Sequence, residues 1–64
     1  MKTYKIEKHD RWTGKVSSYG SRCTYEEFLK YTKGWKKSEL TKKPDHFMME
    51  RENSRYHIWV TVKG

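Results

Sequence analysis

The chain has 64 residues, a formal net charge of +7 and one cysteine, with 33% hydrophobic and 16% aromatic residues. This length fits one domain with a thin core, which must rely on large rings because the sequence has no alanine. The single cysteine excludes an internal disulfide and is typical of a reducing compartment. No apolar run is long enough for a signal peptide or a membrane span, so we expect an intracellular, cytoplasmic protein without a membrane partner.

The positive charge is segregated along the chain. Residues 1–23 contain six Lys or Arg against two acids, and residues 30–43 contain six lysines against Glu39. Residues 44–64 carry three charges of each sign. A surface field of one sign attracts polyanions or acidic proteins, so the pattern indicates a small basic binding module.

Residues 3–21 are expected to form a first hairpin. In its first strand, Tyr4, Ile6 and Lys8 lie on one side and polar residues on the other, which is the period of a half-buried strand.

The turn and second strand of this hairpin follow from two residue types. Asp10 begins the turn and Gly14 closes it in the left-handed region, a common hairpin connection. The second strand, over residues 15–21, has a weak pattern, and Gly20 indicates a bulge or a frayed end.

Residues 24–33 are expected to form a short helix. Thr24 and Glu27 are spaced as a capping box, and Cys23 and Phe28 are spaced as a hydrophobic staple around it. The helix is too short to persist without a sheet to pack on. Gly34 is placed to end it. The face expected to be buried consists of Tyr25, Phe28, Leu29 and Thr32.

Residues 34–45 form a lysine-rich segment that reads as a loop. It could hold one more helical turn capped by Ser38, and Pro44 ends it in either case.

Residues 46–63 are expected to form a second hairpin around a two-residue turn at Asn53 and Ser54. The resulting register pairs Phe47 with Val60 and Met49 with Ile58 on the core face. The other face pairs Met48 with Trp59, Glu50 with His57, and Glu52 with Arg55. The order predicts an α+β fold of the ββαββ type, with one four-stranded antiparallel sheet and a single helix on one face.

The lysines of the helix and the loop give the strongest functional signal. Ammonium groups neutralise phosphates, and rings such as Tyr31 and Trp35 among them can stack on unpaired bases. The alternative is a solvated surface that keeps a small protein in solution. The lysines concerned are Lys30, Lys33, Lys36, Lys37, Lys42 and Lys43, with Arg11, Lys15 and Arg22 as a second basic strip.

The sheet face without a helix gives a second signal. It should expose Met48 and Trp59, with His57 beside them, and such a patch would stack bases or anchor a protein. Alternatively, the register is inverted or the lysine-rich loop covers the patch. Trp12, at the tip of the first hairpin, would contact a partner or else fold back against the edge of the core.

Metal, cofactor and catalytic signals are weak. The three histidines and Cys23 match no familiar zinc spacing, so we expect no metal and no cofactor. Glu50 and His57 face each other and could in principle act as base and acid. The sequence has no nucleophile elbow and no glycine-rich phosphate loop, so we expect a module that is not an enzyme.

Two hypotheses follow, and neither rests on a family signature. The first is a nucleic-acid-binding module in which the basic residues contact phosphates and Trp35 and Trp59 stack on bases. The second is a protein-binding inhibitor or adaptor, which uses Trp59, Met48 and Trp12 against an acidic partner such as a nucleic-acid enzyme. Small, highly charged domains of this kind are typical of viral and mobile-element inhibitors. A homodimer that covers the Met48 and Trp59 patch is a third possibility.

Overall fold

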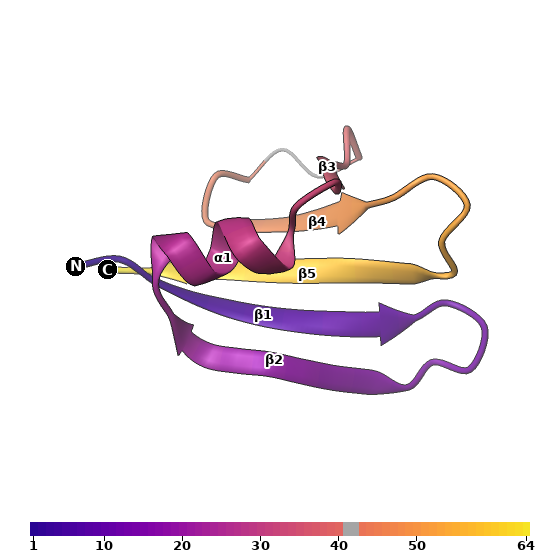
Figure 1. Ribbon diagram of the computed structural model, residues 1–64, viewed down its shortest axis with the longest axis horizontal. Helices are drawn as coiled ribbons and strands as arrows, with labels where there is room; N and C mark the ends of the chain where they lie inside the picture. Colours follow the sequence, from indigo (N-terminus) through magenta and orange to yellow (C-terminus); the bar gives the residue numbers. More distant parts are fainter. Residues whose placement is uncertain (41–42) are drawn as a thin grey trace.

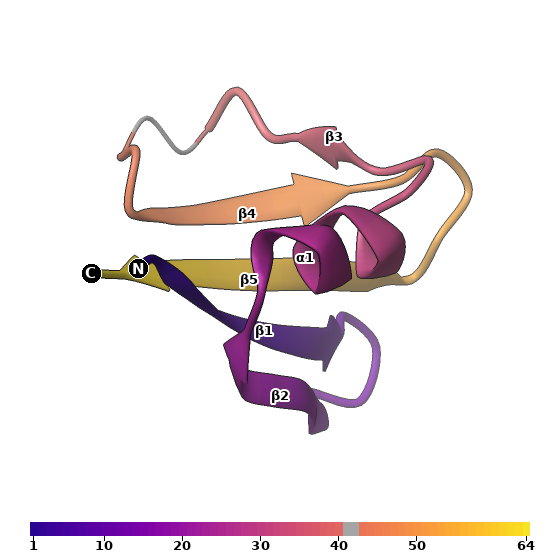
Figure 2. The same ribbon diagram turned by 60° about the vertical axis from the view of Figure 1, so that its left-hand side comes forward.

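The protein forms one antiparallel sheet of five strands with one short helix, as seen in a computed structural model that describes residues 1–40 and 43–64. In chain order the elements are β1 (Thr3–Asp10), β2 (Val16–Cys23), α1 (Tyr25–Tyr31), β3 (Lys36–Lys37), β4 (His46–Glu50) and β5 (Tyr56–Lys63). The strand order in the sheet is β2-β1-β5-β4-β3, and α1 lies on one face (Figures 1 and 2). The predicted α+β class, with an antiparallel sheet and a helix on one face, is confirmed.

The predicted number of four strands is wrong, because the lysine-rich segment contributes a fifth. β3 has only two residues, and it pairs Lys36 with Glu50 and Lys37 with Met49. Without β3, β4 would be an edge strand. A very short, lysine-rich strand is one of the ways in which proteins protect a sheet edge.

The start of α1 follows the prediction closely. The Thr24 hydroxyl accepts a hydrogen bond from the Glu27 amide at 3.2 Å, and the Glu27 carboxylate accepts one from the Thr24 amide at 3.0 Å. Together the two bonds complete the capping box. The helix ends at Tyr31, earlier than predicted, with Thr32 as its C-cap. The predicted buried face is wrong in part, because Tyr25 is 56% and Leu29 48% exposed while Tyr31 packs against the core.

The second hairpin has the predicted register but a wider turn. Phe47 pairs with Val60 and Met49 with Ile58, as expected. The predicted two-residue turn, and with it the pairing of Glu52 with Arg55, is wrong, because β4 stops at Glu50 and β5 starts at Tyr56. The loop between them turns at Asn53, whose φ of 61° lies in the left-handed region.

The first hairpin confirms both of its predicted features. Gly14 has a φ of 76°, and its amide donates to the Asp10 carbonyl at 2.8 Å. The β1–β2 register shifts twice between Tyr4 and Glu7, and Gly20 lies at this bulged region. β2 continues to Cys23, two residues beyond the predicted end at residue 21.

The two faces of the sheet differ in character. The face under α1, here called the helix face, includes the fully buried Ile6, Ile58 and Val60. The opposite face, here called the open face, is not covered by α1. Because directly paired residues point to the same side of a sheet, the register places His9, His57 and Glu50 in one row across this face.

Candidate nucleic-acid interface

Two loops meet at the end of the sheet that lies away from the chain termini (Figure 1). The first is the β1–β2 loop. The Asp10 carboxylate orders this loop by accepting hydrogen bonds from the backbone amides of Trp12 at 2.9 Å and Thr13 at 3.3 Å. The second is the β4–β5 loop. We call this region the hairpin end, defined by residues 10–15 and 51–55.

A buried carboxylate joins the two loops. Arg55 donates to the Asp10 carboxylate at 2.6 Å, and the Arg11 amide donates to the Arg55 carbonyl at 2.9 Å. Burial raises the pKa of the Asp10 carboxyl. Hydrogen bonds from the Trp12 amide and from Arg55 outweigh this effect, so the pKa lies below its ordinary value. Asp10 is therefore ionised at neutral pH and holds the Arg55 guanidinium in place.

Cations and aromatic rings alternate across the hairpin end and the adjoining part of the helix face. The Arg55 guanidinium lies 5.1 Å from the centroids of both the Trp12 and Tyr56 rings. The Lys8 ammonium lies 4.6 Å from the Tyr56 ring and 5.9 Å from the Tyr19 ring. At this spacing each cation is attracted to the ring faces beside it. The full series is Trp12, Arg55, Tyr56, Lys8 and Tyr19.

A cavity of about 240 Å³ lies beside this series on the helix face. It brings together three cationic side chains, those of Lys8, Lys15 and Arg55, with the Ser17 hydroxyl. Among the described residues that line the cavity, Asp10 is the only one with a carboxylate, and that carboxylate already accepts a hydrogen bond from Arg55. The cavity therefore has the donors and the charge that a phosphate group needs.

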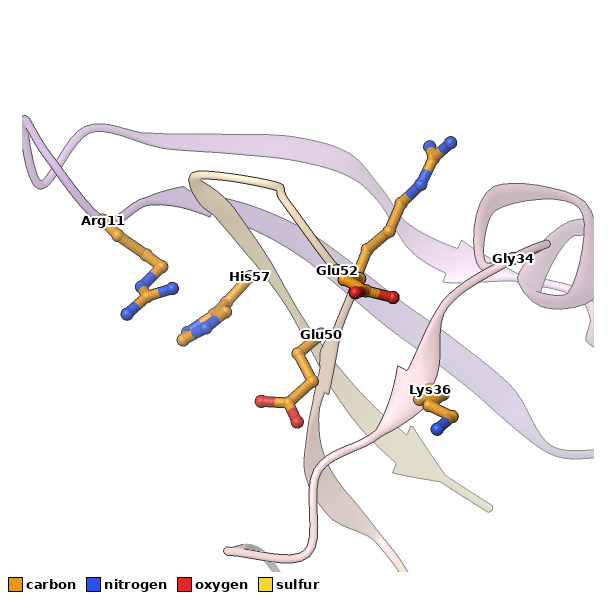
Figure 3. Close-up of a pocket in the computed structure, with 7 residues that line it drawn as sticks. Arg11, Gly34, Lys36, Glu50, Glu52 and His57 are labelled. Carbon is orange, nitrogen blue, oxygen red and sulfur yellow. The ribbon is translucent and has the colours of Figure 1, made fainter.

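The hollowed surface continues around the hairpin end. A groove of about 530 Å³ contains Trp12, Arg55 and Tyr56 and extends to Arg51 and Glu52. Both of these residues also line a cavity of about 590 Å³, which reaches the open face (Figure 3). The three hollows are neighbours around the hairpin end, since Arg55 and Tyr56 line both the cavity of about 240 Å³ and the groove.

The cavity of about 590 Å³ gathers charged groups from several elements. Figure 3 shows the side chains of Arg11, His57 and Glu50 pointing to the same side of the sheet, with His57 between the other two. Burial and the nearby Arg11 charge lower the pKa of His57, while Glu50 acts in the opposite direction. His57 is therefore mainly neutral at pH 7.

The predicted basic residues do not form one strip. Lys36 and Lys37 lie on opposite faces, since Lys36 pairs with Glu50 whereas the Lys37 ammonium lies 4.8 Å from the Phe47 ring. Lys42 lies outside the described residues. Arg11 and Lys15 lie at the hairpin end, and Trp12 between them is 77% exposed rather than folded against the core. The exposed Lys30 lies on α1, Lys33 in the turn that follows it, Arg22 on β2 and Lys43 in the segment before β4.

The predicted exposed patch of Met48 and Trp59 is largely closed. Met48 is only 7% exposed, and Ser38, which follows β3, donates its amide to the Met48 carbonyl. Trp59 is half-buried, with the His46 ring stacked on it at 5.1 Å. Trp35 packs against the core. These findings correct the expectation that Trp35, Trp59 and Met48 are freely exposed rings and side chains.

Sequence reasoning missed Lys8, Tyr19, Arg55 and Tyr56 as parts of a site. One signal was available, because Lys8 occupies an inward position in the alternation of β1. Its position beside Tyr56 could not be predicted from the sequence. It depends on the pairing of β1 with β5, which joins residues about fifty positions apart.

Comparison with protein-family models, with curated proteins and with solved structures found no match. Within residues 1–40 and 43–64, no helix is long and apolar enough to cross a bilayer. Over the same residues, no three His, Cys, Asp or Glu side chains are grouped as metal ligands.

Proposed function

We propose that this protein binds single-stranded nucleic acid along the hollowed surface at the hairpin end. The observation that carries this proposal is the alternating series of cations and rings, Trp12, Arg55, Tyr56, Lys8 and Tyr19. A single strand presents phosphates and unpaired bases in alternation, so a surface with alternating cations and rings complements both.

The division of roles follows from exposure and charge. Lys8, Lys15 and Arg55 surround the cavity of about 240 Å³ and would contact phosphates. Trp12 is 77% exposed, more than Tyr19 or Tyr56, so it is the ring of the series most able to accept a base. A base inside a duplex is stacked on its neighbours and cannot reach Trp12, which favours a single strand.

Binding to a labelled single strand, measured by fluorescence anisotropy, tests the role of Trp12. Trp12→Ala should weaken binding by about tenfold, since a base stacked on an aromatic ring contributes roughly 1–3 kcal/mol. Trp12→Phe, the matched control, keeps a ring and should retain most of the affinity. If Trp12→Ala binds as tightly as the unchanged protein, Trp12 is not the stacking ring.

A protein partner is the second candidate, and the composition of the same surface favours it. Trp, Arg and Tyr are the residue types enriched in interface hot spots, and the hairpin end presents Trp12, Arg55 and Tyr56 together. The +7 charge would then steer association with an acidic partner. Binding to nucleic acid should be strongest at low salt, and the logarithm of its binding constant should fall linearly with the logarithm of the salt concentration. If the protein binds no single strand even at low salt, the second candidate is favoured.

A further inference from the structure

The cavity of about 590 Å³ holds the groups needed for acid–base chemistry, and it shares Arg51 and Glu52 with the groove of the proposed binding surface. Its reactive side chains come from regular strands and the ordered β1–β2 loop. His57 lies on the central strand β5, Glu50 on the neighbouring β4, and Arg11 directly after β1 (Figure 3). Groups fixed on rigid elements are suited to catalysis because little reorganisation is required.

His57 has the protonation state of a general base. Its half-buried imidazole lies near Arg11, and both burial and this positive charge lower its pKa. A neutral imidazole at pH 7 has a nitrogen lone pair that can accept a proton. Glu50, directly opposite on β4, would stabilise the imidazolium once it forms.

Arg11 supplies the complementary function. It is exposed, lines the same cavity as His57, and carries a positive charge on a planar guanidinium. A guanidinium in this position stabilises the negative charge that develops on the oxygens of a phosphoryl group under attack. A base beside an anion-stabilising group is the combination that cleavage of a phosphodiester by a neighbouring hydroxyl needs.

We propose that this cavity cleaves RNA by metal-independent transphosphorylation, an inference that rests on the proposed binding of a single strand. His57 accepts the proton of a ribose 2′-hydroxyl, the 2′-oxygen forms a bond to phosphorus, and the bond from phosphorus to the 5′-oxygen breaks. The imidazolium returns the proton through water to the 5′-oxygen. The products are a 2′,3′-cyclic phosphate and a 5′-hydroxyl, with no net change in protons. This activity departs from the sequence-based expectation of a module that is not an enzyme.

The charged and titratable groups around His57 determine how the reaction responds to pH. They are His9 on β1, Glu50 on β4, Lys36 on β3, Arg11 in the β1–β2 loop, and Arg51 and Glu52 in the β4–β5 loop. Arg11 and His9 disfavour the imidazolium, whereas Glu50 favours it. The rate should therefore rise with pH while His57 loses its proton and then reach a plateau.

The first experiment incubates a single-stranded RNA with the full chain in excess chelator and detects the cyclic phosphate product. His57→Gln should lower the rate by about 100-fold or more, which is the usual contribution of a general base. His46→Gln, purified identically, is the matched control. It changes a histidine on the same face that contacts Trp59 and lies outside the cavity, and it should keep the full rate. Equal rates for the two variants would overturn the proposal and indicate a contaminating nuclease.

Two exposed positions keep the proposal testable if His57→Gln fails to fold. Arg11→Ala removes the charge that lowers the pKa of His57, so the acid limb of the pH–rate profile should move to higher pH. Glu50→Gln removes the opposing charge, so the limb should move to lower pH. Opposite displacements support His57 as the base, while profiles that do not move, or that move together, contradict it.

Failure of catalysis can be separated from failure of binding. A single strand of the same sequence with 2′-deoxyribose lacks the nucleophile and reports binding alone. If it binds and the RNA is not cleaved, only the catalytic proposal is overturned. If neither strand binds at low salt, the proposed function is wrong and the catalytic proposal is wrong with it.

Discussion

Single residues at the hairpin end act through the constraints that they place on their neighbours. Asp10 accepts two loop amides and one guanidinium, and in this way it fixes both Trp12 and Arg55. The side chains that the hairpin end displays are therefore held in place by one of its own buried residues. Gly20 constrains a different part of β2, where a Cβ atom would lie 2.6 Å from the Cys23 sulfur.

The tight approach at Gly20 predicts the effect of a methyl group there. Gly20→Ala should lower the free energy of unfolding by about 1–3 kcal/mol, because the added carbon overpacks against the buried Cys23. Urea denaturation measures the loss. The Gly20→Ala/Cys23→Ala double variant should recover part of it beyond additivity, and strictly additive effects would contradict the contact.

The lowered pKa of His57 predicts how the free energy of unfolding depends on pH. The folded-state pKa of His57 lies below its ordinary value of 6.5, so the unfolded chain binds more protons as the pH falls through that value. The free energy of unfolding should therefore decrease between about pH 7 and pH 5, and His57→Gln should flatten that part of the curve. An unchanged slope in the variant would show that His57 does not carry the dependence.

At the scale of elements, local signals were predictable and pairings between distant segments were not. The capping box at Thr24 and Glu27 and the turn closed by Gly14 each depend on a few adjacent residues, so the sequence was sufficient to find them. The register of the second hairpin followed from alternation within one segment. β3 was missed because two consecutive lysines carry no strand signal, and only the free edge of β4 explains their conformation.

The capping box makes a prediction for α1. This helix has only seven residues, so its first turn contributes a large share of its stability. Thr24→Ala should lower the free energy of unfolding by about 1 kcal/mol, whereas Thr24→Ser keeps the acceptor oxygen and should have little effect. Thermal or urea unfolding of the two variants checks this, and equal losses would show that the cap bond is not what matters.

At the scale of the whole molecule, charge segregation along the chain did not become one basic face. The sheet separates Lys36 from Lys37, and the order of its strands brings Lys8 next to Tyr56, which no linear pattern could reveal. The candidate interface could be predicted only in part. Arg11, Trp12 and Lys15 are adjacent in sequence, but their partner Arg55 reaches Asp10 across 45 positions.

The measurement that tests the proposed interface most directly compares two charge reversals in single-strand binding. Lys15→Glu alters the cavity beside Lys8 and Arg55, while Lys5→Glu alters an exposed position on the open face. Both variants change the formal charge equally, so non-specific attraction to a polyanion falls by the same amount. We expect Lys15→Glu to weaken binding about tenfold more than Lys5→Glu and to reduce the salt slope by about one. Equal losses in the two variants would contradict a binding surface at the hairpin end.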